Sequence, residues 1–540
     1  MRVRVGGISA LTIAALLVAC GGAAAPATSP ATTTAPVRPA KQLSIAIWSA
    51  PDTLNPVVAQ TGYDQDIIGP MYDTLVWESP DQQFHPLLAA SWDVSSDSRT
   101  FTFHLDPKAT WTDGQPVTSA DVAYTLQLNT DPAIPSTLGS YMSMIQGTDA
   151  QGHSLDPAQP LAGVSTPDAN TIQIQTKTPI DPYMLLYNIA ALMYVVPQHA
   201  LKSIAPADFA KAPVFQNPQV TDGPYKFVKY VTSQYAELAA NASYHLGKPP
   251  IDTVYIKIVP PTSMLAELRD GEIDVAVNNI PLQDWPTVAT LPNVKQDPVS
   301  GLGAQFVVIN TARPYLASPA VRDAIAMAID RQAIVSDLLK GEGTVPTGPF
   351  ASFYTTYYDT SLKAIPYDTA GAKAALAAAG FPANQALSLL VPTGDQIRME
   401  TGPLLQQDLQ AAGLNVQIRQ YDFGTMIAQV EKGNFDFALV GSSYANDPLR
   451  SSLFFTCKGS LNLSKFCDPL VDQAYQQATS TSDAAARKAA YDRLQEELQK
   501  QEPFVFLYDA NGLLAYNTRV MGTAIPNAYG MQQPWHWDVK

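Results

Sequence analysis

The 540-residue chain contains few of the residues on which catalytic and metal sites depend. It has three cysteines and six histidines. No histidine lies in an H-E-x-x-H motif or near a cysteine, so the sequence carries no zinc signature. It also lacks a G-x-S-x-G elbow, a Walker loop and a G-x-G-x-x-G motif. No pair of carboxylates stands out for acid–base work on a glycosidic bond. We therefore expect a protein that is not an enzyme, needs no cofactor and binds no metal.

Charged residues and long apolar runs are scarce as well. The chain has 33 Lys and Arg residues against 48 Asp and Glu residues, which gives a net charge of −15 at pH 7. Such an acidic chain does not favour nucleic acid or anionic lipid headgroups as partners. Beyond the N-terminus, no apolar stretch approaches the length of a membrane span. We expect residues 41–540 to be soluble and to form two or three domains, because so long a chain exceeds one core.

The N-terminus does contain an apolar run, and its surroundings indicate export. Two arginines precede an apolar segment at 8–19 of about 12 residues, whereas a membrane span needs about 20. This pattern predicts a signal peptide over 1–19. The tetrapeptide LVAC at 17–20 resembles a bacterial lipobox, so we predict that Cys20 is lipidated and anchors the mature chain. An ordinary signal peptide with a chance cysteine, or a short buried helix, is the alternative.

The segment that follows is of low complexity. Residues 21–40 are almost entirely Gly, Ala, Pro, Thr and Ser. A stretch of this composition cannot bury enough apolar surface to offset the cost of ordering. We therefore predict a disordered linker over 20–40, with a reach on the order of 25 Å. The linker would hold a folded body above a membrane, facing a periplasm or the cell exterior, and it indicates location rather than activity.

Two further cysteines, Cys457 and Cys467, lie ten positions apart. Export would place them in an oxidising compartment, where an even number of cysteines indicates a disulfide. Closing so short a loop stabilises the fold by about 2–3 kcal/mol in the chain-entropy model. A metal site is disfavoured because no histidine is near the pair.

Helix and strand signals alternate along the body of the chain. The segment 101–105 (FTFHL) alternates like a half-buried strand, and Thr118 or Ser119 is the expected N-cap of a helix over 118–130. After position 301 the alternation becomes regular, which predicts an α/β domain with a largely parallel sheet. Its expected strands are 306–310, 387–391, 416–420, 435–440 and 504–508, and its expected helices include 318–330, 331–340, 369–379, 400–412 and 425–432.

A series of short blocks resembles the bacterial extracellular solute-binding proteins of family 5, which serve ABC importers of peptides and nickel. The most specific block spans 71–125 and begins MYDTLVWESPDQQFHPLLAASWDV. The family's opening pattern matches WSAPDTLNP at 48–56, and further blocks follow in family order, including INTARPYLASPAVRDAIAMAIDRQAI at 309–334. The resemblance covers nearly everything from 43 to about 529. Asp106 stands where the family usually has Arg, and Ser119 where it usually has Ala.

The resemblance implies a fold and a domain layout. The fold is α/β, a two-lobed periplasmic-binding-protein (Venus flytrap) fold of the large type with an extra α+β domain. Chain crossings near 301–303 and 509–512 would act as the hinge between the lobes. The implied boundaries are 41–72, 185–304 and 510–540 for a discontinuous lobe I, 73–184 for domain II, and 305–509 for lobe III.

The resemblance also implies ligand-binding positions. In peptide-binding relatives an Asp shortly before an acidic-Pro pair holds the ligand's amino group; here that segment is GSSYANDP at 441–448, and the position falls on Tyr444. Relatives use an Arg after a lobe III strand for the ligand's carboxylate; here Arg398 is a possible stand-in. Phe423 matches a pocket aromatic, and an ordinary core Phe is the alternative. The ligand-binding candidates are Trp48, Tyr63, Arg398, Phe423, Ser442, Ser443, Tyr444 and Asn446.

These residues favour a monomeric, lipid-anchored receptor that captures a solute, most often a peptide, by hinge closure and passes it to an ABC permease with its ATPase subunits. The altered terminus-binding positions leave an oligosaccharide or another small molecule open as the ligand. Nickel is disfavoured because no His can be assigned to a ligand-facing segment. A sensory or adhesion receptor on the same scaffold and a secreted hydrolase are the remaining alternatives.

Overall fold

The computed structural model describes residues 41–79, 81–277, 280–299, 303–350, 356–442, 447–521 and 533–540. These all belong to one compact unit, Ala40–Lys540. The predicted signal peptide and linker, with Cys20, lie outside the described residues. No helix in the described ranges is long and apolar enough to cross a membrane.

A seven-stranded sheet is built from segments that are far apart in the sequence. Its order is β12-β19-β11-β1-β10-β9-β8. The central strand β1 pairs in parallel with both β10 and β11. Its residues Leu43, Ile45 and Ile47 are buried, which explains its place in the middle of the sheet. The strands are β1 Gln42–Ile47, β8 Tyr225–Val231, β9 Tyr235–Ala240, β10 Thr253–Ile258, β11 Val275–Ala276, β12 Val294–Val299 and β19 Gly512–Asn517.

A four-stranded antiparallel sheet has the order β4-β5-β7-β6. In β5, Phe101, Phe103 and Leu105 are buried and the residues between them are partly exposed, as the alternation predicts. The predicted N-cap of helix α2 (Ser119–Thr130) is confirmed at Thr118, which forms a capping box with Asp121. The strands are β4 Ala89–Val94, β5 Thr100–Leu105, β6 Val164–Asp168 and β7 Thr171–Gln175. Side chains of this sheet and of the seven-stranded sheet share one apolar core.

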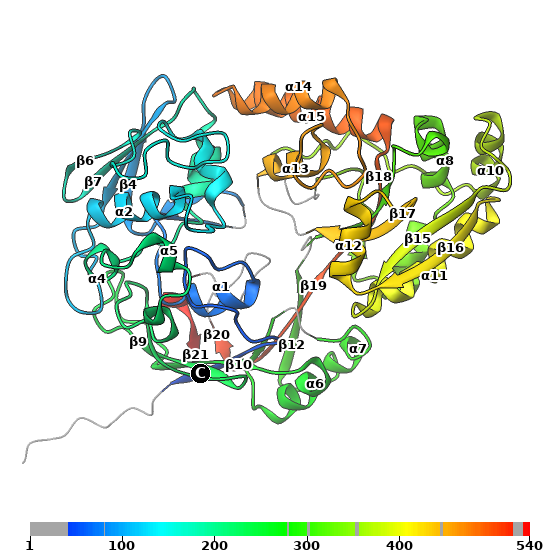
Figure 1. The fold of residues 1–540 in the computed structure, drawn as a ribbon. Helices are drawn as coiled ribbons and strands as arrows, with labels where there is room; N and C mark the ends of the chain where they lie inside the picture. Colours follow the sequence, from blue (N-terminus) through cyan, green and yellow to red (C-terminus); the bar gives the residue numbers. More distant parts are fainter. Residues whose placement is uncertain are drawn as a thin grey trace, which may run out of the picture. The chain divides into compact units, whose positions relative to one another are not determined.

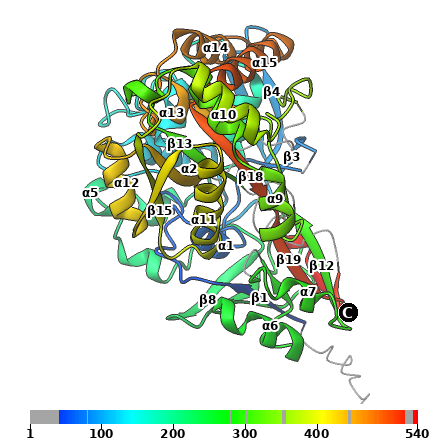
Figure 2. The same cartoon turned by 90° about the vertical axis from the view of Figure 1, so that its right-hand side faces the viewer.

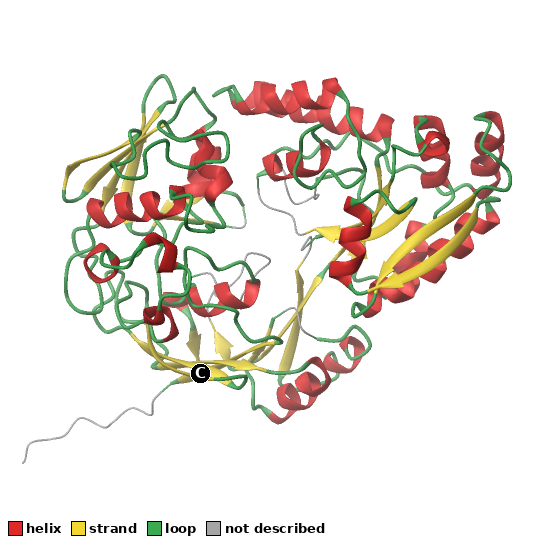
Figure 3. Cartoon of the chain, viewed as in Figure 1, coloured by secondary structure: helices red, strands yellow, loops and turns green. Residues whose placement is uncertain are grey.

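The third large sheet has six strands in the order β14-β18-β13-β17-β15-β16. Helices pack along its strands (Figures 1 and 3), and separate apolar clusters cover it. Its strands are β13 Ala304–Ile309, β14 Gly343–Thr344, β15 Ala386–Pro392, β16 Asn415–Tyr421, β17 Phe437–Ser442 and β18 Phe504–Ala510. Its main helices are α8 Pro319–Met327, α10 Thr369–Ala378, α11 Gln396–Ala411, α12 Phe423–Glu431, α14 Pro469–Thr479 and α15 Ala484–Gln501.

The expectation of a largely parallel sheet is wrong in part. β15 pairs in parallel with β16 and β17, but β13 is antiparallel to both of its neighbours, β17 and β18. The reason lies in where β13 begins. Its first residue, Ala304, lies opposite Ser442 at the end of β17 and Asp509 near the end of β18. A strand that enters the sheet at the edge where the others end must run against them.

Two neighbouring stretches of chain connect the seven-stranded and six-stranded sheets. β12 leads toward β13, and β18 continues into β19 with only Asn511 between them. β12 pairs with β19 and β13 pairs with β18, both antiparallel. Figure 2 shows β18 and β19 following one another through the molecule. One crossing therefore falls within the expected range 509–512, whereas residues 301–302 of the other lie outside the described residues.

Smaller elements complete the fold. Cys457 and Cys467 form a disulfide with a Cα–Cα distance of 4.4 Å, between α13 and α14. The remaining helices include α1 Gly62–Ile68, α3 Pro182–Leu185, α4 Gln198–Leu201, α5 Pro206–Phe209, α6 Pro261–Asp270, α7 Trp285–Val288, α9 Arg331–Ala333 and α13 Ser452–Phe455. Two two-stranded antiparallel sheets pair β2 Val76–Glu78 with β3 Phe84–Pro86, and β20 Val520–Met521 with β21 Asp538–Val539.

Candidate functional site

Candidate ligand residues gather at one edge of the six-stranded sheet. β15, β16 and β17 run in the same direction and end at this edge. β15 is followed by α11 and β16 by α12. In open α/β sheets, ligands bind outside the carboxyl ends of the strands. Arg398, Phe423 and Ser442 lie at or just beyond these three strand ends, so this edge is the candidate site.

Arg398 and Phe423 contact each other. The guanidinium carbon of Arg398 lies 5.9 Å from the centre of the Phe423 ring, and 46 % of Phe423 is exposed. Arg398 Nε donates a hydrogen bond to Gln305 Oε1 at 2.8 Å and lies 3.4 Å from Asp395 Oδ2. The Nε donor of this arginine, one of its five N–H groups, is therefore used within the chain itself.

Gly441 allows this arrangement. It lies opposite Gln305 in the β13–β17 pairing. A Cβ atom at position 441 would lie 2.3 Å from Gln305 Nε2 and 2.6 Å from Arg398 Nη2. A larger residue at this position would push Arg398 out of its place.

The segment after β17 carries the other predicted ligand residues. Ser442 is the last residue of β17, and Ser443, Tyr444 and Asn446 lie outside the described residues. Asp447 ends this segment and is buried. Its carboxylate receives a hydrogen bond from the backbone N–H of Leu449 at 2.8 Å.

Asp447 belongs to a buried group that we call the Arg487 cluster: Arg487, Asp447, Asp181, Tyr357 and Tyr491. Arg487 Nη2 donates to both oxygens of Asp447, at 2.9 and 2.8 Å. Arg487 Nη1 donates to Tyr357 Oη at 2.7 Å and to Asp181 Oδ2 at 3.4 Å. The Arg487 side chain is 0 % exposed. Burial alone would lower the pKa of Arg487, but the Asp447 carboxylate holds that pKa well above its usual value.

The Arg487 cluster has two consequences. Asp447 is neutralised inside the protein, so it is not available to pair with a ligand's amino group. The cluster also ties the end of the segment 441–447 to Asp181, the N-cap residue of α3. Sequence reasoning missed Arg487 because its partners lie in other parts of the chain.

Trp48 and Tyr63 form a second aromatic pair. Their ring centres are 5.3 Å apart, edge to face, and 49 % of Trp48 is exposed. Burial, and then the charge of Asp66, raise the pKa of Tyr63 to about 12. Burial raises the pKa of Asp66 itself to about 7. Among the described residues, the structure brings Trp48 to Tyr63 and Arg398 to Phe423 as two separate pairs.

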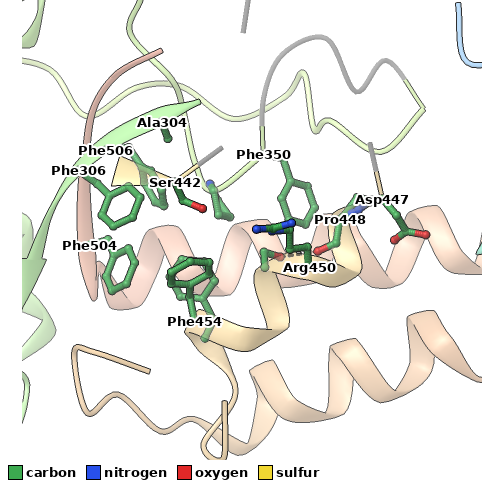
Figure 4. A pocket seen from close by; sticks show the side chains of 13 residues that line it. Ala304, Phe306, Phe350, Ser442, Asp447, Pro448, Arg450, Phe454, Phe504 and Phe506 are labelled. Atoms are coloured by element: carbon green, nitrogen blue, oxygen red, sulfur yellow. Dashed lines mark hydrogen bonds between the residues drawn. The ribbon is translucent and has the colours of Figure 1, made fainter. Parts of the chain in front are cut away.

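An aromatic pocket adjoins the candidate site, and we call it the phenylalanine pocket (Figure 4). Its cavity volume is about 40 Å³, within a wider space of about 440 Å³ that includes open solvent. Ser442 is the predicted residue that lines it. The sequence signal that could have located it is the Phe-x-Phe pattern at 504–506, which places both rings on one face of β18. Its lining residues are Ala304, Phe306, Pro349, Phe350, Ser442, Asp447, Pro448, Arg450, Ser451, Phe454, Phe455, Phe504 and Phe506.

The histidines that the structure places near acids do not form a metal centre. Within the described ranges, no group of three or more His, Cys, Asp or Glu residues is arranged to hold a metal ion. His245 is buried between two aspartates, while His104 pairs with Asp93 near the surface.

Two chain connections join the seven-stranded and the six-stranded sheets, and the candidate site lies at strand ends next to one of these connections. This arrangement defines a two-lobed periplasmic binding protein. The sequence pattern of the bacterial extracellular solute-binding proteins, family 5, matches residues 83–462, and the chain belongs to this family.

Individual proteins agree over most of the chain. The oligopeptide-binding protein AppA of Bacillus subtilis is 23 % identical over 535 residues, which cover 95 % of this chain and 94 % of AppA. Di/tripeptide-binding protein 2 of Pseudomonas aeruginosa is 26 % identical and covers 92 % of this chain and 93 % of its own length. The crystal structure of the ABC transporter substrate-binding protein CtaP from Listeria monocytogenes shares the fold with a TM-score of 0.83 at 22 % identity, covering 93 % of this chain and 99 % of CtaP.

Proposed function

We propose that the protein is the substrate-binding component of an ABC importer and that its ligand is a peptide. The observation that carries the proposal is the candidate site at the strand ends of a family 5 fold, since relatives that match nearly the whole chain are named for oligopeptides and for di- and tripeptides. The loaded protein would deliver the peptide to a membrane permease, and ATP hydrolysis would belong to separate subunits.

The two chain crossings support capture by hinge closure. Residues 41–72, 185–304 and 510–540 would form lobe I, 73–184 domain II, and 305–509 lobe III. Lobe III would swing toward lobe I about Asn511 and the neighbouring crossing between β12 and β13. Ligand contacts on both lobes stabilise the closed form, and only a difference in affinity between open and closed forms can shift the population. A micromolar dissociation constant corresponds to a favourable binding free energy of about 8 kcal/mol.

The N-terminal sequence supports attachment to a membrane. A signal peptide over 1–19 would be removed, Cys20 would be acylated, and 20–40 would tether a monomeric receptor to the membrane surface. Incorporation of radiolabelled palmitate into the wild-type chain, and its loss in Cys20→Ser, is the expected result. Labelling that persists in Cys20→Ser would refute the assignment.

The pairing of Asp447 with Arg487, together with the Nε bond of Arg398, favours a ligand whose termini are not held as in dipeptide receptors. Asp447 is paired with Arg487, and Arg398 is bonded to Gln305. A longer peptide bound mainly through its backbone fits this state. A non-peptide solute, such as an oligosaccharide, is the second candidate for the same reason.

A thermal-shift screen tests the proposal. The mature chain starting at residue 20, with Cys20→Ser to prevent acylation, is heated with peptides of two to eight residues, with oligosaccharides or with Ni²⁺. Binding to the folded state raises the midpoint, by an amount that grows with ligand concentration over Kd. We expect a shift with peptides longer than three residues. A shift with oligosaccharides alone would show that the peptide assignment is wrong.

A further inference from the structure

Three members of the Arg487 cluster join the six-stranded sheet region to the segment that follows the four-stranded sheet. Asp181 comes after β7 and caps α3, whereas Arg487 lies on α15 and Tyr357 between β14 and α10. Asp181 Oδ2 accepts a hydrogen bond from Tyr357 Oη at 3.1 Å and one from Arg487 Nη1 at 3.4 Å. Tyr357 Oη itself accepts from Arg487 Nη1 at 2.7 Å. We call these three residues the Asp181 latch.

The Asp181 latch is shielded from water. Asp181 is 5 % exposed, Tyr357 2 % and Arg487 0 %. Buried charges are screened by salt much less than exposed ones. Hydrogen bonds to charged groups contribute enough net free energy to favour the joined form by about tenfold or more.

Further contacts surround the latch at the same boundary. Thr356 Oγ1 donates a hydrogen bond to Gln82 Oε1, in the turn between β2 and β3, at 3.3 Å. The ring of Tyr357 meets that of Tyr183 edge to face, with ring centres 6.3 Å apart. Leu449 packs against the apolar core that the four-stranded and seven-stranded sheets share. The boundary therefore combines polar and apolar contacts.

The latch lies away from the chain crossings. The chain passes from the six-stranded to the seven-stranded sheet between β18 and β19, at Asn511. Figures 1 and 2 show α15 at the end of the molecule away from β12 and β19. When two bodies rotate about a hinge, the contacts farthest from the hinge separate most. The latch must therefore break before the six-stranded sheet can swing away.

The latch is complete without any group from outside the chain. Asp181 faces a hydroxyl and a guanidinium, and the charge of Arg487 is also balanced by Asp447 on its own side of the boundary. A ligand shifts an open–closed population only through its different affinity for the two forms. Here the chain itself supplies contacts that the open form would lack.

We propose that the Asp181 latch holds the protein in a closed form without a ligand, and that the latch breaks before a solute enters or leaves the candidate site. The inference goes beyond the proposed function, because it concerns the open–closed equilibrium of the chain alone. A closed resting form slows the exchange of solute with solvent. It also increases the fraction of molecules in which both sides of the site are already in place.

The distance between two spin labels measures the equilibrium without a ligand. In the mature chain with Cys20→Ser, the labels are attached through Leu155→Cys, which precedes β6, and Leu470→Cys, in α14; both leucines are exposed. The two remaining cysteines form the disulfide and do not react with the label. Double electron–electron resonance gives the distribution of distances. We expect one short-distance population in the otherwise unchanged chain.

Two variants break the latch from its two sides. Asp181→Ser keeps a side-chain oxygen that can cap α3 but is too short to reach Tyr357. Tyr357→Phe removes only the hydroxyl group. Each change should raise the ratio of open to closed form by about tenfold, which adds a population at longer distances. The double variant should add little to either single variant, because both changes break the same contact.

Tyr358→Phe and Asp368→Ser are the matched controls. Tyr358 Oη shares a hydrogen bond with Thr347 Oγ1, and Asp368 caps α10, so both changes stay within the six-stranded sheet region. Neither should alter the distance distribution. Far-UV circular dichroism establishes that each variant is folded. If Asp181→Ser does not fold, Tyr357→Phe decides the outcome, because it removes a single oxygen atom.

Two results would overturn the inference. One is a chain with an intact latch whose open population without a ligand is as large as its closed population. The other is a distance distribution of the latch variants that superposes on that of the chain with an intact latch, since the closed form would then not depend on these contacts. Because no ligand is added, neither result bears on the proposed function, which the thermal-shift screen tests separately.

Discussion

Two buried ionic clusters connect distant parts of this chain, and they differ in the cation at their centre. The Arg487 cluster places a guanidinium between Asp447 and Asp181. We call the other the His245 cluster: His245, Asp73, Asp106, Asp222 and Tyr244. His245 Nε2 lies 3.1 Å from Asp73 Oδ2, and Nδ1 lies 3.2 Å from Asp106 Oδ2. A guanidinium stays charged at all ordinary pH values, whereas an imidazole does not.

The surroundings of His245 make its charge depend on its partners. Both ring nitrogens face carboxylates, so the cluster favours the doubly protonated imidazole, in which both nitrogens donate. Burial lowers the pKa of His245, but hydrogen bonds and charges of Asp73 and Asp106 outweigh it and raise the pKa. Burial, and then the charge of Asp73, raise the pKa of Asp222 well above its usual range. The comparison shows that similar geometry can have different pH dependence. The charge of the Arg487 cluster's guanidinium does not change with pH, whereas that of the His245 cluster's imidazole does.

Loss of the guanidinium should have the largest effect on stability. Arg487→Met leaves Asp447 and Asp181 buried without a cation, which we expect to lower the free energy of unfolding by about 3–5 kcal/mol. Urea denaturation at pH 7 measures the change in free energy of unfolding. Arg493→Met, on the surface of the same helix, is the control. A loss below about 0.5 kcal/mol, the range of ordinary surface substitutions, would show that the cluster is not a structural link.

Loss of the imidazole should have a smaller effect that depends on pH. His245→Gln should cost about 2–3 kcal/mol at pH 6, where two hydrogen bonds to charged groups are lost. Because the folded-state pKa is raised, this stabilisation is complete below the unfolded-state pKa of about 6.5 and is lost as pH rises through the folded-state value. The difference in free energy of unfolding between wild type and His245→Gln should therefore become smaller from pH 6 to pH 9.

Urea denaturation at pH 6, 7.5 and 9 measures this trend in the free energy of unfolding. Arg487→Met, measured in parallel, should differ from wild type by the same free energy at each pH. His104→Gln, which alters a His–Asp pair 3.1 Å apart but exposed, is the matched control. A wild-type to His245→Gln difference that stays constant with pH would mean that His245 does not titrate in the folded state.

The smallest effect should come from the outer carboxylate of the Arg487 cluster. In Asp181→Asn an amide oxygen can still accept from the backbone N–H of Tyr183, which now donates to Asp181 at 2.9 Å. The charge that faces Arg487 at 3.4 Å is lost, at a cost of about 1 kcal/mol. The same urea experiment at pH 7 measures it. A loss as large as that of Arg487→Met would identify Asp181, rather than Asp447, as the main counter-ion.

Much of the fold could be predicted because its signals are local. Alternation in 101–105 places Phe101 and Phe103 on the buried face of β5, and Thr118 caps α2 through a residue three positions away. The strand ends that position Arg398 and Phe423 follow from the same local periodicity. The direction of β13 could not be predicted in this way, because it depends on the edge at which the chain re-enters the sheet.

The candidate site was predictable only where a single segment carries its residues. Tyr444, Ser443 and Asn446 were located by resemblance and stay predictions, since they lie outside the described residues. The chain's own partners for Arg398 and Asp447 were not foreseen. Gln305 lies on another strand, and Arg487 is 40 positions from Asp447.

By itself, the sequence determined the class of protein, the elements of its sheets and the segments in which a ligand site should lie, because short-range patterns of polarity encode these features. Only the tertiary structure decided which charges are already neutralised and which remain open to a ligand. Arg487 meets Asp181 across 306 positions, while Arg450 lines a mainly apolar pocket and is paired with no carboxylate of the described residues. Two charged groups pair when they are close in space. Folding sets that distance, and it cannot be predicted from the separation of the two residues along the chain.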